Sequence, residues 1–253
     1  MSPIEVALVV VAGFLAGVVN AIAGGGSLIS FPMLLAVGFP SVTANVTNNI
    51  AMWPGYASSA MGFRTELEGQ RGRLVELGAT TAAGGVLGAV LLLALPSDVF
   101  DAAVPWCVLF ASAILAAQSR LSAWLRRRPA APGRAEHRSV GLHASLFVAG
   151  TYGSYFGGGL GVVLLGVLGL FLADHLHTVI GLKNVLSIVV ASVGVVSFVA
   201  FAPVAWGAFA VMAPASFAGG FAGTRLVKVI APEVLRWTIV VTGVFVGLVM
   251  LLT

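Results

Sequence analysis

Apolar stretches of roughly 20 residues, the length of a helix that crosses a bilayer core, follow one another along nearly the whole chain. A transmembrane β-barrel would instead show short segments that alternate between apolar and polar residues, and this chain does not. Because a backbone inside hydrocarbon finds no water, helices are the remaining way to satisfy its polar groups. The pattern therefore predicts an all-α polytopic membrane protein.

Three consecutive glycines interrupt the apolar pattern twice. Gly24-Gly25-Gly26 follows an apolar segment at 4–23, and Gly157-Gly158-Gly159 ends another at 140–156. A short apolar piece comes after each triplet, at 27–37 and at 162–173. Since a helix rises about 1.5 Å per residue, each short piece covers about half of a bilayer core. Each triplet therefore predicts a broken, re-entrant-like helix pair.

The order of segments repeats along the chain. Three full-length apolar segments follow each short piece, at 42–63, 74–95 and 99–118 in the first half and at 177–201, 204–224 and 234–252 in the second. Individual residues also repeat: 17–26 matches 150–159 at an offset of 133 residues, and 47–50 matches 182–185 at an offset of 135. We expect two related halves.

The predicted halves are residues 1–118 and 140–253, joined by a polar linker at 119–139. Each half would contain one glycine-broken helix pair and three transmembrane helices. The linker carries a run of three arginines and two prolines, a composition typical of a solvated connection.

The charges support the membrane assignment and predict an orientation. Charged residues are 9% of the chain, against about 25% in soluble proteins, and the net charge of +4 does not indicate nucleic-acid binding, because the basic residues are confined to loops. Three loops, 64–73, 119–139 and 225–236, hold every Lys and Arg except Lys183. Basic loops favour the cytoplasm, which places both termini outside and makes the two halves inverted repeats.

The glycine triplets are candidate binding elements for an anion. Glycine weakens a helix and adopts positive φ without strain, so three in a row stop a helix inside the membrane. The next helix then begins with free N–H groups and a positive dipole end, which attract negative charge. Ser27 can cap or donate at the first break. The alternative is close packing of helices, for which glycine is common in membranes.

A second polar group begins the segment at 42–63. Asn45, Thr47, Asn48 and Asn49 lie there, and the three asparagines occupy positions i, i+3 and i+4, which share one helical face. Amide groups can coordinate an oxyanion without the cost of a buried charge. They can equally join helices or cap a helix end.

Lys183 matches Asn48 in the repeat, and Asn184 matches Asn49. A lysine inside a membrane segment indicates function by default, and it could pair with a bound anion. The alternative is that its ammonium snorkels to the headgroups. Asn20, one turn before the first break, and Tyr155, just before the second, are further candidates to line a site.

Catalytic and metal chemistry find little support. Cys107 is the one cysteine and lies in an apolar run. His175 and His177 have no thiolate and a single carboxylate, Asp174, beside them in the sequence, so a solvated turn is favoured over a metal site. The chain has no Walker sequence and no nucleophile–base pair. We expect no enzymatic activity, no cofactor and no metal.

The stretch 17–29, with Asn20 and the first glycine triplet, resembles the TauE/SafE family of sulfite exporters. Pro32 in the short helix and the element 44–49 are similar to that family's pattern, as are 150–161 and 179–184 in the second half. The resemblance implies a bacterial inner-membrane permease for sulfur-containing anions. The chain departs from the family pattern at Asn45-Val46 and at Leu182-Lys183, within the expected site, so its substrate could differ from sulfite.

Together these observations predict a secondary transporter of a small oxyanion such as sulfite or an organosulfonate, working by alternating access, with export as the direction that the resemblance implies. Two other classes stay open: an anion or small-solute channel with two re-entrant elements, and a non-transporting membrane partner subunit. The expected partners are the small anion and membrane lipid, not nucleic acid, and a homo-oligomer is left open.

Overall fold

The computed structural model describes residues 1–22, 24–127, 139–172, 174–226 and 232–252. These residues form helices and contain no β-strand. The helices are α1 (Pro3–Ile22), α2 (Ser27–Ala36), α3 (Ser41–Gly62), the short 3-10 helix η1 (Thr65–Leu67), α4 (Arg71–Ala94), α5 (Ser97–Arg127), α6 (Val140–Tyr155), α7 (Leu160–Phe171), α8 (Leu176–Phe201), α9 (Trp206–Leu226) and α10 (Pro232–Leu252). The all-α prediction is confirmed.

Four of the described helices, α1, α4, α5 and α8, are long and apolar enough to cross a membrane. Shorter apolar helices are α2, α7 and the part of α10 at 237–252. Large apolar side chains such as Val86, Val196 and Phe201 are exposed on the outside of the bundle. An apolar surface of this kind fits a lipid environment rather than water.

The expected polar linker at 119–139 differs from the structure at its start. Helix α5 continues through the first arginines and ends at Arg127, so residues 119–127 are helical, whereas 128–138 lie outside the described residues. The reason is that leucine, alanine and arginine are good helix formers, so a helix continues after its side chains become polar.

The first helix of each half packs against the fourth helix of the other half. Helix α1 lies along α9, and α6 lies along α4. Glycines allow both contacts: a Cβ on Gly17 would collide with the carbonyl oxygen of Ser216, and a Cβ on Gly150 would collide with that of Thr81. Gly17 matches Gly150 and Thr81 matches Ser216 at the two offsets found in the sequence. The contacts therefore follow the internal repeat.

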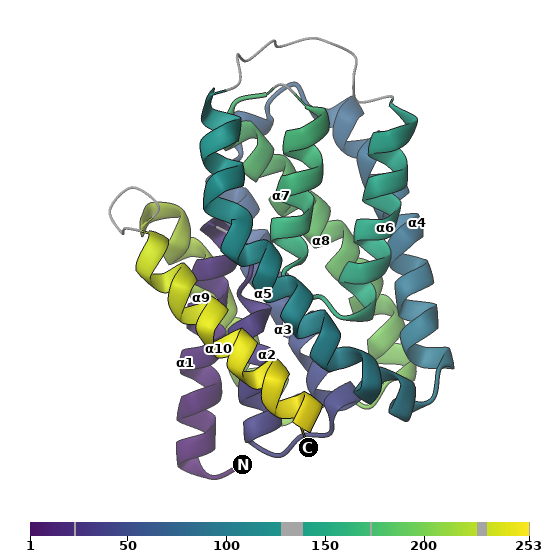
Figure 1. The fold of residues 1–253 in the computed structure, drawn as a ribbon, viewed down its shortest axis with the longest axis vertical. Coiled ribbons are helices and arrows are strands. Elements are labelled where there is room, and N and C mark those ends of the chain that lie inside the picture. The colour runs from purple at the N-terminus through teal and green to yellow at the C-terminus, as the bar shows by residue number, and fades with distance from the viewer. Residues whose placement is uncertain (23, 128–138, 173, 227–231, 253) are drawn as a thin grey trace.

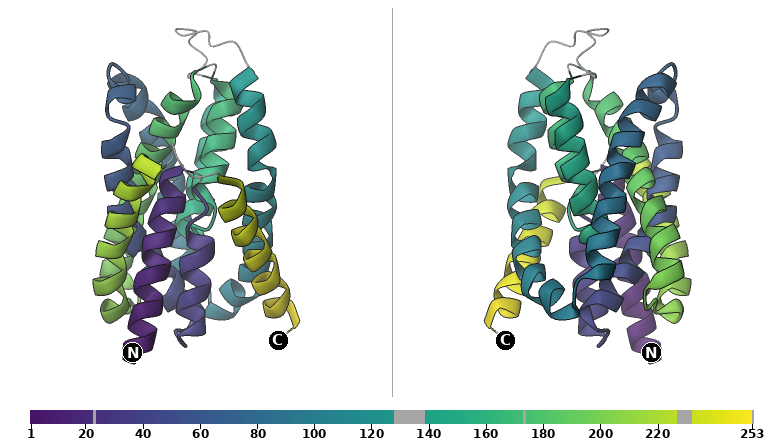
Figure 2. Two further views of the ribbon diagram at one scale, coloured as in Figure 1. Left: turned by 90° about the vertical axis from the view of Figure 1, so that its left-hand side faces the viewer. Right: turned by 90° about the vertical axis from the view of Figure 1, so that its right-hand side faces the viewer.

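The two glycine-broken pairs occupy opposite ends of the bundle. In Figure 1, α1 and α2 lie in the lower part, toward the labelled termini, and α6 and α7 lie in the upper part. Figure 2 shows the same division from both sides, with N and C at the same end. The pairs meet in the middle, where a Cβ on Gly161 would lie 2.5 Å from the Cα of Gly24.

Candidate functional site

The first break is held by the side chain that precedes it. Helix α1 ends at Ile22, Gly24 takes a φ of +94°, and α2 starts at Ser27. The Oδ1 of Asn20 accepts a hydrogen bond of 2.8 Å from the N–H of Gly26. This bond satisfies one of the amides that a helix start leaves without an internal partner. Asn20 therefore fixes the angle between the two half-helices.

The second break is held from another helix. Gly157 and Gly159 have φ values of +78° and +75°. Two asparagines of α3 reach the last turn of α6: the Nδ2 of Asn45 donates to the carbonyl of Tyr155 at 2.9 Å, and that of Asn49 donates to the carbonyl of Gly153 at 3.3 Å. These carbonyls belong to the last four of the helix, which lack an internal donor. The first half of the chain thus caps a broken helix of the second.

Lys183 of α8 makes the reciprocal contact. Its ammonium donates to the backbone carbonyl of Asn20 at 2.8 Å, in the last turn of α1. The side chain is 1% exposed, which rules out the snorkelling alternative in this structure. No described carboxylate lies within 4 Å of its nitrogen. A buried lysine amine thus stands beside the first break, and its described partner is a neutral carbonyl oxygen.

A small cavity lies between these elements. Its volume is about 10 Å³, close to the space that one water needs. It is lined by Ser27, Asn49, Met52, Tyr56, Gly153, Gly157, Leu160, Val190 and Ala191. Ser27 and Leu160 are repeat equivalents, as are Tyr56 and Ala191. The cavity therefore lies where corresponding faces of the two halves meet.

Several buried polar atoms of α1, α3 and α8 have no hydrogen-bond partner among the described residues. Both side-chain atoms of Asn184 are in this state, and so is the Oγ of Ser187 one turn later. Asn184, Ser187 and Ala191 occupy i, i+3 and i+7 on α8, so they share the face that reaches the cavity. The Nδ2 of Asn20 and the Oδ1 of Asn45 are also unpaired. Buried polar groups are normally satisfied, so these atoms are candidates to contact water or a polar ligand.

Comparison with known proteins identifies the chain. The family model described as "Sulfite exporter TauE/SafE" matches residues 9–250. The chain belongs to the TauE/SafE family. It is 26% identical over 254 residues to the probable membrane transporter protein YfcA of Escherichia coli (strain K12), a match that covers 96% of this chain and 88% of that protein.

Two shorter matches agree with this assignment. The probable membrane transporter protein ORF9 of Sinorhizobium sp is 32% identical over 103 residues, and a probable membrane transporter protein of Haemophilus influenzae is 28% identical over 152 residues. These matches cover 40% and 57% of the lengths of those two proteins. No solved structure matches the chain. This TauE/SafE chain is a multi-pass membrane protein.

Some residues that the sequence assigns to the site have other partners in this TauE/SafE structure. The Oδ1 of Asn48 accepts from the hydroxyl of Ser30 on α2 at 2.5 Å, and the hydroxyl of Thr47 accepts from the N–H of Ala205 before α9 at 2.9 Å. Both contacts join helices. Three of the amides expected to face an anion are also engaged: those of Leu28 and Ile29 donate to Gly25 and Gly26, and that of Leu160 donates to Gly157.

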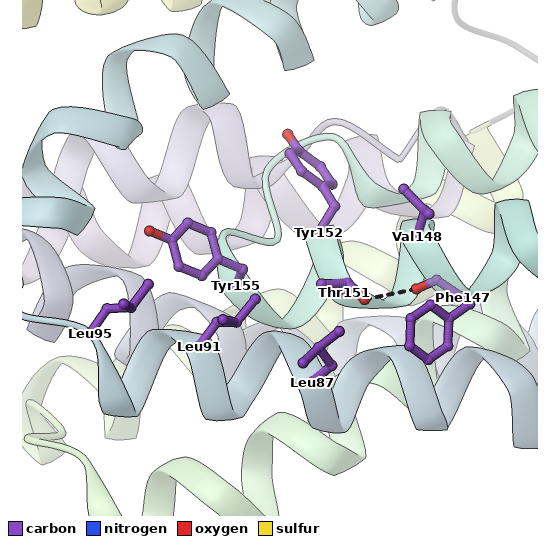
Figure 3. Close-up of a pocket in the computed structure, with 8 residues that line it drawn as sticks. All are labelled: Leu87, Leu91, Leu95, Phe147, Val148, Thr151, Tyr152 and Tyr155. Atoms are coloured by element: carbon purple, nitrogen blue, oxygen red, sulfur yellow. Dashed lines mark hydrogen bonds between the residues drawn. The ribbon is translucent and has the colours of Figure 1, made fainter.

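Tyr155 lies on the opposite side of α6 from the cavity. It lines an apolar surface groove of about 410 Å³ between α4 and α6, together with Tyr152 and leucines of α4 (Figure 3). The hydroxyl of Tyr152 donates to the carbonyl of Gly158 at 2.5 Å. Sequence analysis did not single out Ser187, Tyr56 or this role of Tyr152. The position of Ser187 one turn after Asn184 was the available signal.

The described residues contain no group of three or more His, Cys, Asp or Glu side chains that could hold a metal ion. His175 and His177 lie on either side of Leu176, the first residue of α8.

Proposed function

We propose that this protein is a secondary transporter of a small sulfur-containing oxyanion, such as sulfite or an organosulfonate, and that it works by alternating access. The observation that carries the proposal is Lys183, a buried lysine that can pair with an anion and has no described carboxylate partner. It lies at a helix break where the Nδ2 of Asn20 is unpaired. The TauE/SafE family membership agrees with such a substrate.

The cost of burying charge explains why an anion is favoured. A buried ammonium that lacks an opposite charge is strongly destabilising, and the carbonyl of Asn20 offsets only part of that cost. A bound anion would neutralise Lys183, while the Nδ2 atoms of Asn20 and Asn184 and the hydroxyl of Ser187 could donate to its oxygens. Every one of these atoms is already buried, so the site would need little further desolvation.

The size of the cavity favours a carrier over a channel. A volume of about 10 Å³ holds no oxyanion, so the helices around it must move apart before a substrate enters. Two broken helix pairs reach this point from opposite ends of the bundle (Figures 1 and 2). Movement of one pair at a time would open the site to one side and then to the other, as in transporters with inverted repeats. A channel would need both paths open at once.

The proposal also includes location and direction. We place the protein in the bacterial inner membrane, with both termini extracytoplasmic and the linker in the cytoplasm, because the basic loops favour that side. An inside-negative potential favours the exit of an anion by about 2.3 kcal/mol per charge per 100 mV. Export therefore needs no coupling ion. Reporter fusions at residue 1 and at 253, compared with an insertion at 133, test the orientation.

Counterflow in liposomes tests the function. Purified protein is reconstituted with internal sulfite or an organosulfonate, and entry of the same labelled anion is followed. We expect saturable exchange that Asn184→Ala abolishes and Thr151→Ala, a change on the groove side of α6, leaves intact. Rapid single-channel currents would support the channel alternative instead. If no sulfite, sulfonate, sulfate or carboxylate moves, the proposal is wrong.

A further inference from the structure

The charge of the site is asymmetric between the two halves. Lys183 and Asn48 are repeat equivalents, yet only the lysine can carry a positive charge. Both are buried, with exposed fractions of 1%. The two halves thus contribute at most one positive charge at this pair of repeat positions, where two lysines would contribute two.

Among the side chains that the structure describes, no arginine is buried in the bundle beside Lys183. Five other arginines have described side chains, all exposed or partly exposed: Arg64, Arg71, Arg73, Arg120 and Arg225. The other buried polar side chains that the structure describes are neutral amides and hydroxyls. An anion bound there would therefore meet a single full positive charge.

The position of Lys183 on α8 connects this charge with the cavity. Lys183, Ser187 and Val190 occupy i, i+4 and i+7, so they share one face of the helix, and Val190 lines the cavity. The carbonyl of Asn20 holds the ammonium at the end of α1, and the side chain of the same residue holds the N–H of Gly26. An anion paired with Lys183 would thus lie against the first break.

We propose that the site takes singly charged oxyanions, such as sulfonates or hydrogen sulfite, and discriminates against doubly charged ones, with Lys183 as the residue that sets this preference. This inference rests on the proposed function. A singly charged anion and one ammonium form a neutral buried pair, whereas a doubly charged anion leaves one uncompensated charge in a closed, low-dielectric site. Neutral donors stabilise that second charge less well than a second cation would.

Two probes of fixed charge test the preference in proteoliposomes at neutral pH: methanesulfonate, which is singly charged, and sulfate, which is doubly charged. We expect uptake of methanesulfonate to exceed that of sulfate at least tenfold. Lys183→Arg should keep this ratio, whereas Lys183→Asn, which copies the residue of the other half, should lower methanesulfonate uptake at least tenfold and remove most of the discrimination. Thr151→Ala is the control that should change neither rate.

A second variant keeps the inference testable if Lys183→Asn does not fold, which size-exclusion chromatography would show. Asn48→Lys adds the missing charge to the first half and should raise sulfate uptake relative to methanesulfonate. Equal uptake of both probes by the unaltered protein would leave the oxyanion transporter standing and overturn the charge preference. An unchanged ratio in folded Lys183→Asn would overturn the role of Lys183. Failure of every anion to move would remove the proposed function and this inference together.

Discussion

Gly24 and Gly161 face each other across the meeting point of the two broken helix pairs, and neither position has space for a side chain. A Cβ on Gly161 would lie 2.5 Å from the Cα of Gly24 and 3.2 Å from its carbonyl oxygen. Because the obstacle is backbone, no rotamer change can relieve the overlap. This contact fixes the distance between the two halves at the proposed site.

Gly161→Ala should therefore destabilise the protein by about 1–3 kcal/mol, the usual range for an overpacked core. Thermal unfolding of purified protein in detergent measures the effect. Gly207→Ala is the matched control, since a Cβ there meets nothing within 4 Å. It should leave the midpoint unchanged or raise it slightly. Equal midpoints for the two variants would contradict the close contact.

Asn184 and Asn49 match in the repeat but should respond differently to substitution by alanine. Asn49→Ala removes the donor to the carbonyl of Gly153 and leaves a buried acceptor unsatisfied, at a cost of about 1–3 kcal/mol. Asn184 has no described partner to lose, so Asn184→Ala should cost less stability than Asn49→Ala.

Added anion should distinguish Asn184→Ala from the unaltered protein. Stabilisation by added methanesulfonate should disappear in Asn184→Ala, because we expect that side chain to contact the ligand. The measurement is the thermal midpoint with and without the anion. Unaltered anion stabilisation in Asn184→Ala would place the site elsewhere.

Substitution of Thr47 should lower the stability of the protein without changing its affinity for the anion. Its hydroxyl accepts from the N–H of Ala205 where the chain enters α9. Thr47→Val deletes the acceptor and should lower stability by about 1 kcal/mol, whereas Thr47→Ser should keep it. The concentration of anion that gives half-maximal uptake should be the same in both variants. A large change in that concentration would return Thr47 to the binding site.

An ion pair ties the start of α4 to the turn before α8. The guanidinium of Arg73 lies 2.5 Å from the carboxylate of Asp174, and both side chains are 16% exposed. Partly exposed pairs contribute about 0–1 kcal/mol, so a double-mutant cycle with Arg73→Ala and Asp174→Ala should give a coupling energy within that range. Added salt should reduce it. A coupling energy that salt does not change would show that packing, not charge, joins these residues.

The sequence was sufficient for the helices because hydrocarbon imposes a simple pattern. The predicted short piece at 27–37 is α2 at Ser27–Ala36, and the segment at 204–224 is α9 at Trp206–Leu226. Helix α5 extends to Arg127, beyond the apolar segment expected at 99–118. The reason is that a change from apolar to basic residues marks the edge of the membrane and not the end of a helix.

The site was less predictable, because its contacts join residues far apart in the chain. Asn45 and Asn49 were selected as polar residues on one face, but their bonds to α6 depend on how the two halves pack. The sequence left the burial of Lys183 open for the same reason, because its side chain is held by a carbonyl of α1, a distant part of the chain. Asn184 was selected from the repeat alone, and its role as a ligand stays a prediction.

The packing of α1 against α9, and of α6 against α4, has a consequence for biogenesis. Helix α1 is made first, and its main neighbour, α9, is made nearly last. Until then the glycine-lined side of α1 must face lipid or a chaperone, so the amino-terminal half alone should be a target for membrane proteases. Splitting the gene between α5 and α6 should yield stable protein only when both fragments are produced together.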